Sequence, residues 1–121
     1  MHEVSPENLE LAEKHAIHSK QQAKSIEKCG KVLQAMGEKE SEHGKIIEEY
    51  GNAAQKHAQS SLEHAKAAQK QDADSTEEFV KASEEHVKES QIQIMASKEY
   101  GKLVEKQIQA TKKFLKQDGS I

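Results

Sequence analysis

Small residues recur at every seventh position through the first half of the chain. A seven-residue period in small side chains predicts a helix with one narrow seam, along which a second helix approaches closely. Four interior glycines cost the helix about 4 kcal/mol relative to alanine, so close packing has to compensate for them. The residues of this seam are Ala16, Ala23, Gly30, Gly37, Gly44, Gly51, Ala58 and Ala65.

The pattern divides the chain into two helical segments. Ser5 before Pro6 is typical of a helix N-cap followed by proline in the first turn. We therefore expect a leader over residues 1–5 and a first helix over 6–71, continuous or kinked. The acidic run after it, with Ser75 and Glu78 forming a capping box, predicts a turn at 72–75. A second helix over 76–117 and a tail over 118–121 complete this single helical domain.

The second segment resumes the seven-residue pattern with larger side chains. Folding back at residues 72–75 would set these side chains against the small seam, and it predicts an elongated antiparallel helical hairpin. The expected contact residues in the second helix are Val80, Val87, Ile94, Gly101, Val104, Ile108 and Leu115.

A change of charge in the first segment supports an alternative. Lysines such as Lys31 precede Gly37, whereas Glu38, Glu40 and Glu42 follow it. Basic residues favour the end of a helix and acidic residues favour its start. The alternative is a three-helix bundle with a turn near residues 37–42. In the hairpin, the longer first helix would overhang the second and would need a second chain to cover it.

Composition favours a slim all-α bundle over a thick globular core. Hydrophobic residues make up 34% of the 121 residues and charged residues 32%. The net charge is −3, and all eighteen basic residues are lysines that alternate with glutamates. This arrangement argues against a nucleic-acid partner. One cysteine, no apolar run long enough to span a membrane and no secretory signal predict a soluble, intracellular protein.

The seven histidines are the main candidates for chemistry. His15 and His18 share a helical face, and Glu40 with His43 forms one Glu-x-x-His element. A di-metal carboxylate bundle needs two such elements, and the sequence has no second one. Five of the histidines flank the seam, where half-buried rings are ordinary, so we expect no metal and no cofactor. A weak metal site, or a bundle that loosens near pH 6 as these rings become charged and repel, is a further alternative.

Catalytic chemistry is not indicated. Serines are plentiful, but no nucleophile, base and oxyanion donor form a recognisable group, and the glycines are not clustered as in a phosphate-binding loop. We therefore expect no enzyme activity.

One short segment resembles a known family. Gly30-Lys31-Val32-Leu33, followed by Gly37-Glu38 and Glu40, is similar to part of the long helices of membrane-curving BAR modules. The resemblance covers about a tenth of the chain and implies an antiparallel helical dimer on a membrane surface. The chain is about half the usual length of such modules and lacks their basic clusters.

These observations predict a non-enzymatic structural or protein-interaction module. We expect it to self-associate, with a dimer favoured, or to bind another helical protein through the small-residue seam. A membrane-associated, BAR-like dimer is the alternative.

Overall fold

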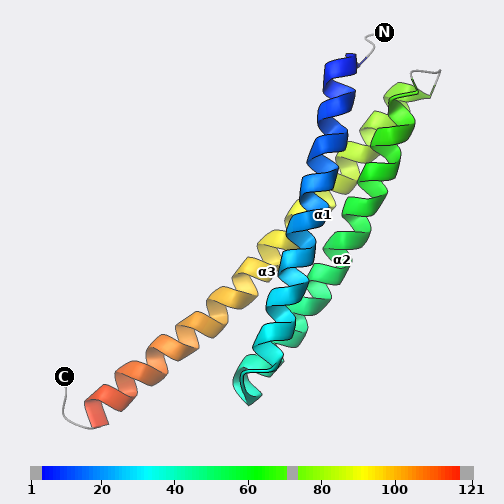
Figure 1. Ribbon diagram of the computed structural model, residues 1–121. Helices are drawn as coiled ribbons and strands as arrows, with labels where there is room; N and C mark the ends of the chain where they lie inside the picture. Colours follow the sequence, from blue (N-terminus) through cyan, green and yellow to red (C-terminus); the bar gives the residue numbers. More distant parts are fainter. Residues whose placement is uncertain (1–3, 71–73, 118–121) are drawn as a thin grey trace.

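The computed structural model describes residues 4–70 and 74–117, which form three helices and no strand. They are α1 (Pro6–Gln34), α2 (Glu38–Ala68) and α3 (Ser75–Gln117), shown in Figure 1. The expected all-α slim bundle is confirmed. Residues 1–3, 71–73 and 118–121, on which parts of the expected leader, first helix, turn and tail fall, lie outside the described residues.

A single first helix over 6–71 is wrong, because the chain reverses between α1 and α2. Ala35 caps α1, and Gly37 continues in an extended conformation before α2 begins at Glu38. Lys31 lies in the last turn of α1 and Glu38 in the first turn of α2. The three-helix alternative is therefore the correct one, with the reversal at residues 35–37.

The start of α1 follows the expected capping pattern. The Ser5 hydroxyl accepts a hydrogen bond from the backbone N–H of Asn8 at 3.2 Å, and Pro6 occupies the first turn. Proline fits there because the first-turn N–H groups have no partner within the helix. Local sequence thus fixes where the bundle begins.

Glycines bring the α1 and α2 backbones into direct contact. A Cβ added to Gly30 would lie 2.5 Å from the carbonyl oxygen of Gly44, and one added to Gly44 would lie 2.6 Å from that of Gly30. A Cβ on Gly51 would lie 2.7 Å from Cα of Glu27. No side chain fits at these distances, so the close antiparallel packing requires glycine at all three positions.

Polar side chains flank this contact at a seven-residue spacing. Four residues of α1 bond to α2, and each lies seven positions after the last. The bonds join Glu13 to Gln69, Lys20 to Gln59 (2.6 Å), Glu27 to Gln55 (3.0 Å) and Gln34 to Glu48 (3.1 Å). Most of these bonds are part-buried amide–carboxylate contacts, which fix the register of two helices whose seam has little shape of its own.

The hydrophobic core is thin. Its largest buried cluster is Leu33, Ile47 and Leu103, one residue from each helix, with Ile26 and Cys29 packed against it. Elsewhere alanines such as Ala54 and Ala58 fill the space between helices. The half-buried Cys29 therefore packs as a small hydrophobic side chain.

α3 packs mainly on α2 and projects past the α1–α2 turn (Figure 1). It has 43 residues, against 29 in α1 and 31 in α2. Residues 107–117 of α3 are exposed except for the half-buried Leu115. We call this segment the overhang. Residues 107–111 line only an open groove with the start of α2, and the rest of the overhang is exposed apart from Leu115. Its helical form therefore gains little from packing within the chain.

Two glycine-to-alanine substitutions test the backbone contact. We expect Gly51→Ala to destabilise the protein by about 1–3 kcal/mol, because the new methyl group forces α1 and α2 apart. Gly101→Ala is the control, since a Cβ there meets nothing within 4 Å. It should stabilise α3 by up to about 1 kcal/mol through helix propensity. Urea unfolding at low micromolar chain concentration measures both, and equal effects at the two positions would contradict the contact.

Candidate interaction surface

Most of the predicted seam residues of α1 and α2 are buried between the helices of the same chain. Six of the seven named contact positions in this half are buried or enclosed between helices, and Gly37 is exposed at the turn. The buried ones are Ala23, Gly30, Gly44, Gly51, Ala58 and Ala65. The seam is therefore occupied by the chain's own helices and is not open to a second chain.

The large residues of α3 do not pack against that seam, and this expectation is wrong. Val87 and Ile94 are 54% and 55% exposed, and Gly101 is exposed as well. Instead, the residues that face the bundle lie two positions further along the same seven-residue repeat: Ala82, Glu89, Ala96 and Leu103. Two residues correspond to about 200° around a helix, so α3 presents nearly the opposite face.

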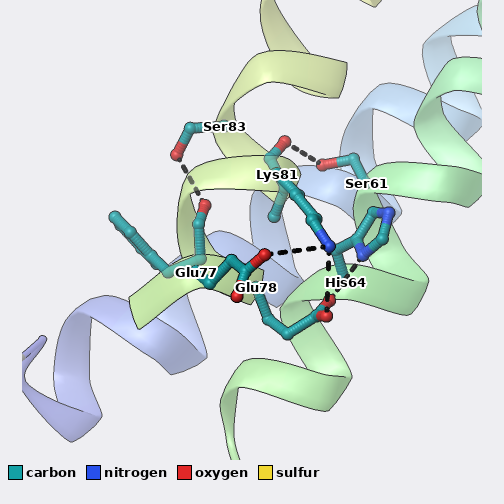
Figure 2. Close-up of polar contacts among 8 residues, drawn as sticks. Ser61, His64, Glu77, Glu78, Lys81 and Ser83 are labelled. Atoms are coloured by element: carbon teal, nitrogen blue, oxygen red, sulfur yellow. Dashed lines mark hydrogen bonds and ion pairs between the residues drawn. The ribbon is translucent and has the colours of Figure 1, made fainter. Parts of the chain in front are cut away.

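The reason is the size of the space left by the α1–α2 contact. Glycine and alanine hold α1 and α2 close together, and Ala82 and Ala96 of α3 fit against this compact pair. At the Ala82 end, the Ser61 hydroxyl of α2 donates a 2.8 Å hydrogen bond to the backbone carbonyl of Ala82 (Figure 2). Bulky residues at the inward positions would hold the helices further apart.

The exposed face of α3 forms one continuous apolar stripe. Its residues repeat at alternating steps of three and four, which is the spacing of one helix face. Large residues occupy most of one set of positions, and serine or threonine occupies most of the other. We define the α3 stripe as Val80, Ser83, Val87, Ser90, Ile94, Ser97, Gly101, Val104, Ile108, Thr111 and Leu115. It runs from the bundle onto the overhang, with Ser90, Val104 and Leu115 half-buried.

An apolar groove adjoins one end of this stripe. It lies between the first half of α1 and the start of α3, and it has a volume of about 270 Å³. Leu11 and His15 line it from α1, and Phe79 and Val87 line it from α3. The rings of His15 and His86 lie 6.1 Å apart at this groove. The apolar surface of α3 therefore continues towards α1 at this end.

Three histidine–glutamate pairs join α2 to α3, and we call them the ladder. His43 Nδ1 lies 2.5 Å from Glu99 Oε2, His57 Nδ1 lies 2.6 Å from Glu85 Oε2, and His64 Nδ1 lies 2.5 Å from Glu78 Oε2. As the histidine number rises along α2, the glutamate number falls by the same amount along α3. The three pairs therefore share one antiparallel register.

The His43 pair is the most buried of the three. His43 is 6% exposed and Glu99 8% exposed. Glu99 Oε2 can only accept, so Nδ1 of His43 donates to it, and Lys106 Nζ donates to Nε2 at 3.1 Å. The His43 imidazole thus lies between a carboxylate and an ammonium group. Lys102 Nζ lies 3.6 Å from Glu99 Oε1, so a second lysine lies beside the His43–Glu99 pair.

At the other end of the ladder, Figure 2 shows Glu78 between His64 of α2 and Lys81 of its own helix. Lys81 also pairs with Glu77 at 3.5 Å. Charging His64 or His57 would bring a positive ring beside a carboxylate. At these two pairs the histidine ring lies against a carboxylate.

Sequence reasoning missed the histidine–glutamate pairs because it placed the histidines beside a seam and did not identify the residues that face them. The signal was present. His43, His57 and His64 are separated by multiples of seven, as are Glu99, Glu85 and Glu78. Matching spacings of opposite direction in two helices predict an antiparallel ladder.

No family model, curated protein or solved structure matches this chain. Its function is therefore argued from its own residues. In residues 4–70 and 74–117 no three histidine, cysteine, aspartate or glutamate side chains gather as a metal site would require. His15 contacts the ring of His86, and His18 bonds to Gln22. None of the three described helices is long and apolar enough to cross a membrane.

Glu89 is a buried carboxylate on the inward face of α3. It is 0% exposed and lies between Ala82 and Ala96 in the repeat. Gln93 bonds to one of its oxygens, whereas Oε2 has no hydrogen-bond partner among residues 4–70 and 74–117. A buried acceptor without a hydrogen bond costs free energy, so α3 is docked less tightly than an apolar residue here would allow.

We expect Glu89→Met to stabilise the protein by about 1–3 kcal/mol in urea unfolding, because it removes that penalty at similar side-chain length. Glu84→Met, at an exposed position of α3, is the matched control and should change stability by less than about 0.5 kcal/mol. Loss of stability in Glu89→Met would show that the carboxylate is needed for α3 docking.

The ladder also predicts a pH dependence. The hydrogen bond from His57 lowers the pKa of Glu85, and that from His43 lowers the pKa of Glu99, below the ordinary glutamate value of 4.5. A lowered pKa in the folded state contributes stability that is present above pH 4.5. That contribution is lost as the pH falls through the folded-state pKa.

We therefore expect Glu85→Gln to be less stable than the wild type at pH 6, and the difference to shrink by pH 3. Urea unfolding across this range measures it. Glu84→Gln, beside it but exposed, should follow the wild type at every pH. A difference between Glu85→Gln and the wild type that stays constant down to pH 3 would contradict the ladder's role.

Proposed function

We propose that the protein is a non-enzymatic helical interaction module that self-associates through the α3 stripe. The observation that carries the proposal is the position of this stripe. Its large residues are apolar and mostly exposed, it lies on the side of α3 turned away from the bundle except at Ser83 and Val87, which line the groove against α1, and it continues onto the overhang. A contiguous exposed apolar surface of this kind is typical of a protein-interaction site.

The overhang adds a second argument. Residues 107–117 extend about 16 Å beyond the part of α3 that the bundle supports, at 1.5 Å per residue. Isolated helices of this length are marginal in water. Ile108, Phe114 and Leu115 give the overhang an apolar side that a partner helix would cover, and that contact would support the helix.

The proposal differs from the sequence expectation in the surface used. The small-residue seam joins α1 to α2 within the chain, and the larger residues that were expected to fill it remain for a partner. Helix-to-helix recognition through positions spaced by three and four is a common binding mode. A different helical protein on the same stripe is the second outcome to be tested.

We expect light scattering with size-exclusion chromatography to give a mass above the 13.5 kDa of one chain. Ile94→Glu should return the mass to that of one chain, because a charge would be buried in the interface. Val32→Glu is the matched control, since Val32 is an exposed α1 residue away from the stripe. A wild type that stays monomeric at high micromolar concentration would contradict self-association.

Sedimentation with acidic liposomes at physiological salt distinguishes the membrane-surface alternative. We expect the protein to remain in the supernatant, with and without Ile94→Glu. Co-sedimentation of the wild type that Ile94→Glu abolishes would assign the stripe to lipid instead.

A further inference from the structure

We infer that the occupant of the α3 stripe is the α3 stripe of a second copy, antiparallel, with Gly101 of each chain facing Val104 of the other. This inference rests on the proposed function and adds a partner, an orientation and a register to it. Three observations support it: the sizes of the stripe residues, the charges beside them, and a depression in the surface of α3.

The sizes alternate in a way that suits antiparallel pairing. In an antiparallel pair, the positions of Ile94 and Ile108 face the positions of Ser97 and Thr111 on the other helix. A parallel pair would instead set large residues against large and serine against serine. Antiparallel pairing therefore fills each layer with one large and one small side chain.

A layer here is a pair of stripe residues, one from each chain, that face each other. Only one register pairs a large residue with a small one in every layer. With Gly101 facing Val104 of the second copy, the neighbouring layers pair a large residue with a small one, and each layer occurs twice by symmetry. These layers are Ile94 with Thr111, Ile108 with Ser97, and Leu115 with Ser90. A shift of one heptad in either direction sets Val104 against Ile94 or Ile108, large against large.

The charges beside the stripe select the same register. Lys98 and Glu105 lie on one flank of it, and neither makes an ion pair within the described part of the chain. In this register Lys98 of each copy faces Glu105 of the other, which gives two attractive pairs. A shift of one heptad sets Lys98 against Lys98 in one direction and against Lys112 in the other, both repulsive.

The surface of α3 has a depression at the place where this register puts large side chains of the second copy. A shallow depression is lined by Ser90, Gln93, Ile94, Ser97 and Lys98. In the proposed pairing, Leu115 of the second copy lies beside Ser90 and Ile108 lies beside Ser97. Two apolar side chains of the overhang thus reach the two serines that line the depression.

The pairing also accounts for the overhang. The contact region runs from Ser90 to Leu115 and centres between Gly101 and Val104, close to where the bundle stops supporting α3. Each overhang would then lie along the second copy's α3. In each copy the α1–α2 pair meets α3 mainly through the face that carries Ala82 and Ala96, nearly opposite the stripe. At the edges of the stripe, Gln93 bonds to Gln22 of α1, and Thr111 lines a groove with Lys39 of α2.

Charge reversal tests the register. Lys98→Glu sets like charges against Glu105 at both symmetric sites, and we expect it to raise the dimer Kd about tenfold or more in analytical ultracentrifugation. Glu105→Lys should do the same through Lys98. The double variant Lys98→Glu with Glu105→Lys should restore a Kd near that of the wild type. A double variant as weak as the single ones would overturn the register.

Disulfide crosslinking gives an independent readout. In a Cys29→Ser background, Ser97→Cys with Ile108→Cys should form a covalent dimer under mild oxidation. These positions are eleven residues apart on one helix, about 16 Å, so they cannot bridge within a chain. Ser90→Cys with Ile108→Cys is the matched control, and it would crosslink efficiently only in a register shifted by one heptad.

The outcomes separate the two proposals. A wild type that is monomeric at all concentrations contradicts self-association and the pairing together. A dimer that Ile94→Glu dissociates, but in which charge reversal is not rescued or the control pair crosslinks better, retains self-association and overturns this register. A dimer that Ile94→Glu does not dissociate would show that the chains associate through another surface. It would overturn both self-association through the α3 stripe and the proposed register.

Discussion

The backbone contact between α1 and α2 is the constraint on which the rest of the structure depends. Gly30, Gly44 and Gly51 allow the two helices to approach until backbone atoms touch. Because glycine weakens a helix, this contact has to supply compensating packing. It also removes the small-residue seam from the surface. The compact α1–α2 pair then accepts small inward residues from α3, chiefly Ala82 and Ala96. The face that α3 turns towards the bundle is set by this packing of small residues.

Polar contacts between the helices fix their register, which the small seam residues specify only weakly. A seam of glycine and alanine fits in several registers with little difference in packing, whereas a histidine or glutamine has to meet its carboxylate. The pairs His57 with Glu85 and Gln55 with Glu27 each fix α2 against a different neighbour. α2 is thus held in register on both sides, which suits its place as the helix with the most extensive contacts. Glu89 is the exception, since one of its oxygens lacks a hydrogen-bond partner within the part of the chain that the structure describes.

The sequence predicted the helical class, the cap at Ser5 and the burial of most seam residues, because these depend on local propensity and on one strong period. It favoured the wrong number of helices, because the heptad phase runs unbroken through Gly37 while the charge change from Lys31 to Glu38 was the better guide. It also chose the wrong face of α3. Hydrophobicity selects the most apolar face, and Val87 and Ile94 lie on it, but the space beside two closely packed helices admits alanine. The most apolar face therefore stays outside. This exposed apolar face is the basis of the proposed self-association.

Hydrogen exchange measured by NMR at a series of chain concentrations tests this division of surfaces most directly. It reports protection at each backbone amide, and it separates contacts within a chain from contacts between chains. The account predicts strong protection around Gly30, Gly44 and Gly51 that does not change with concentration, and protection over residues 90–115 of α3 that rises as chains associate. Protection that rises with concentration at the glycines, while α3 stays constant, would show that the seam joins separate chains and would contradict the account.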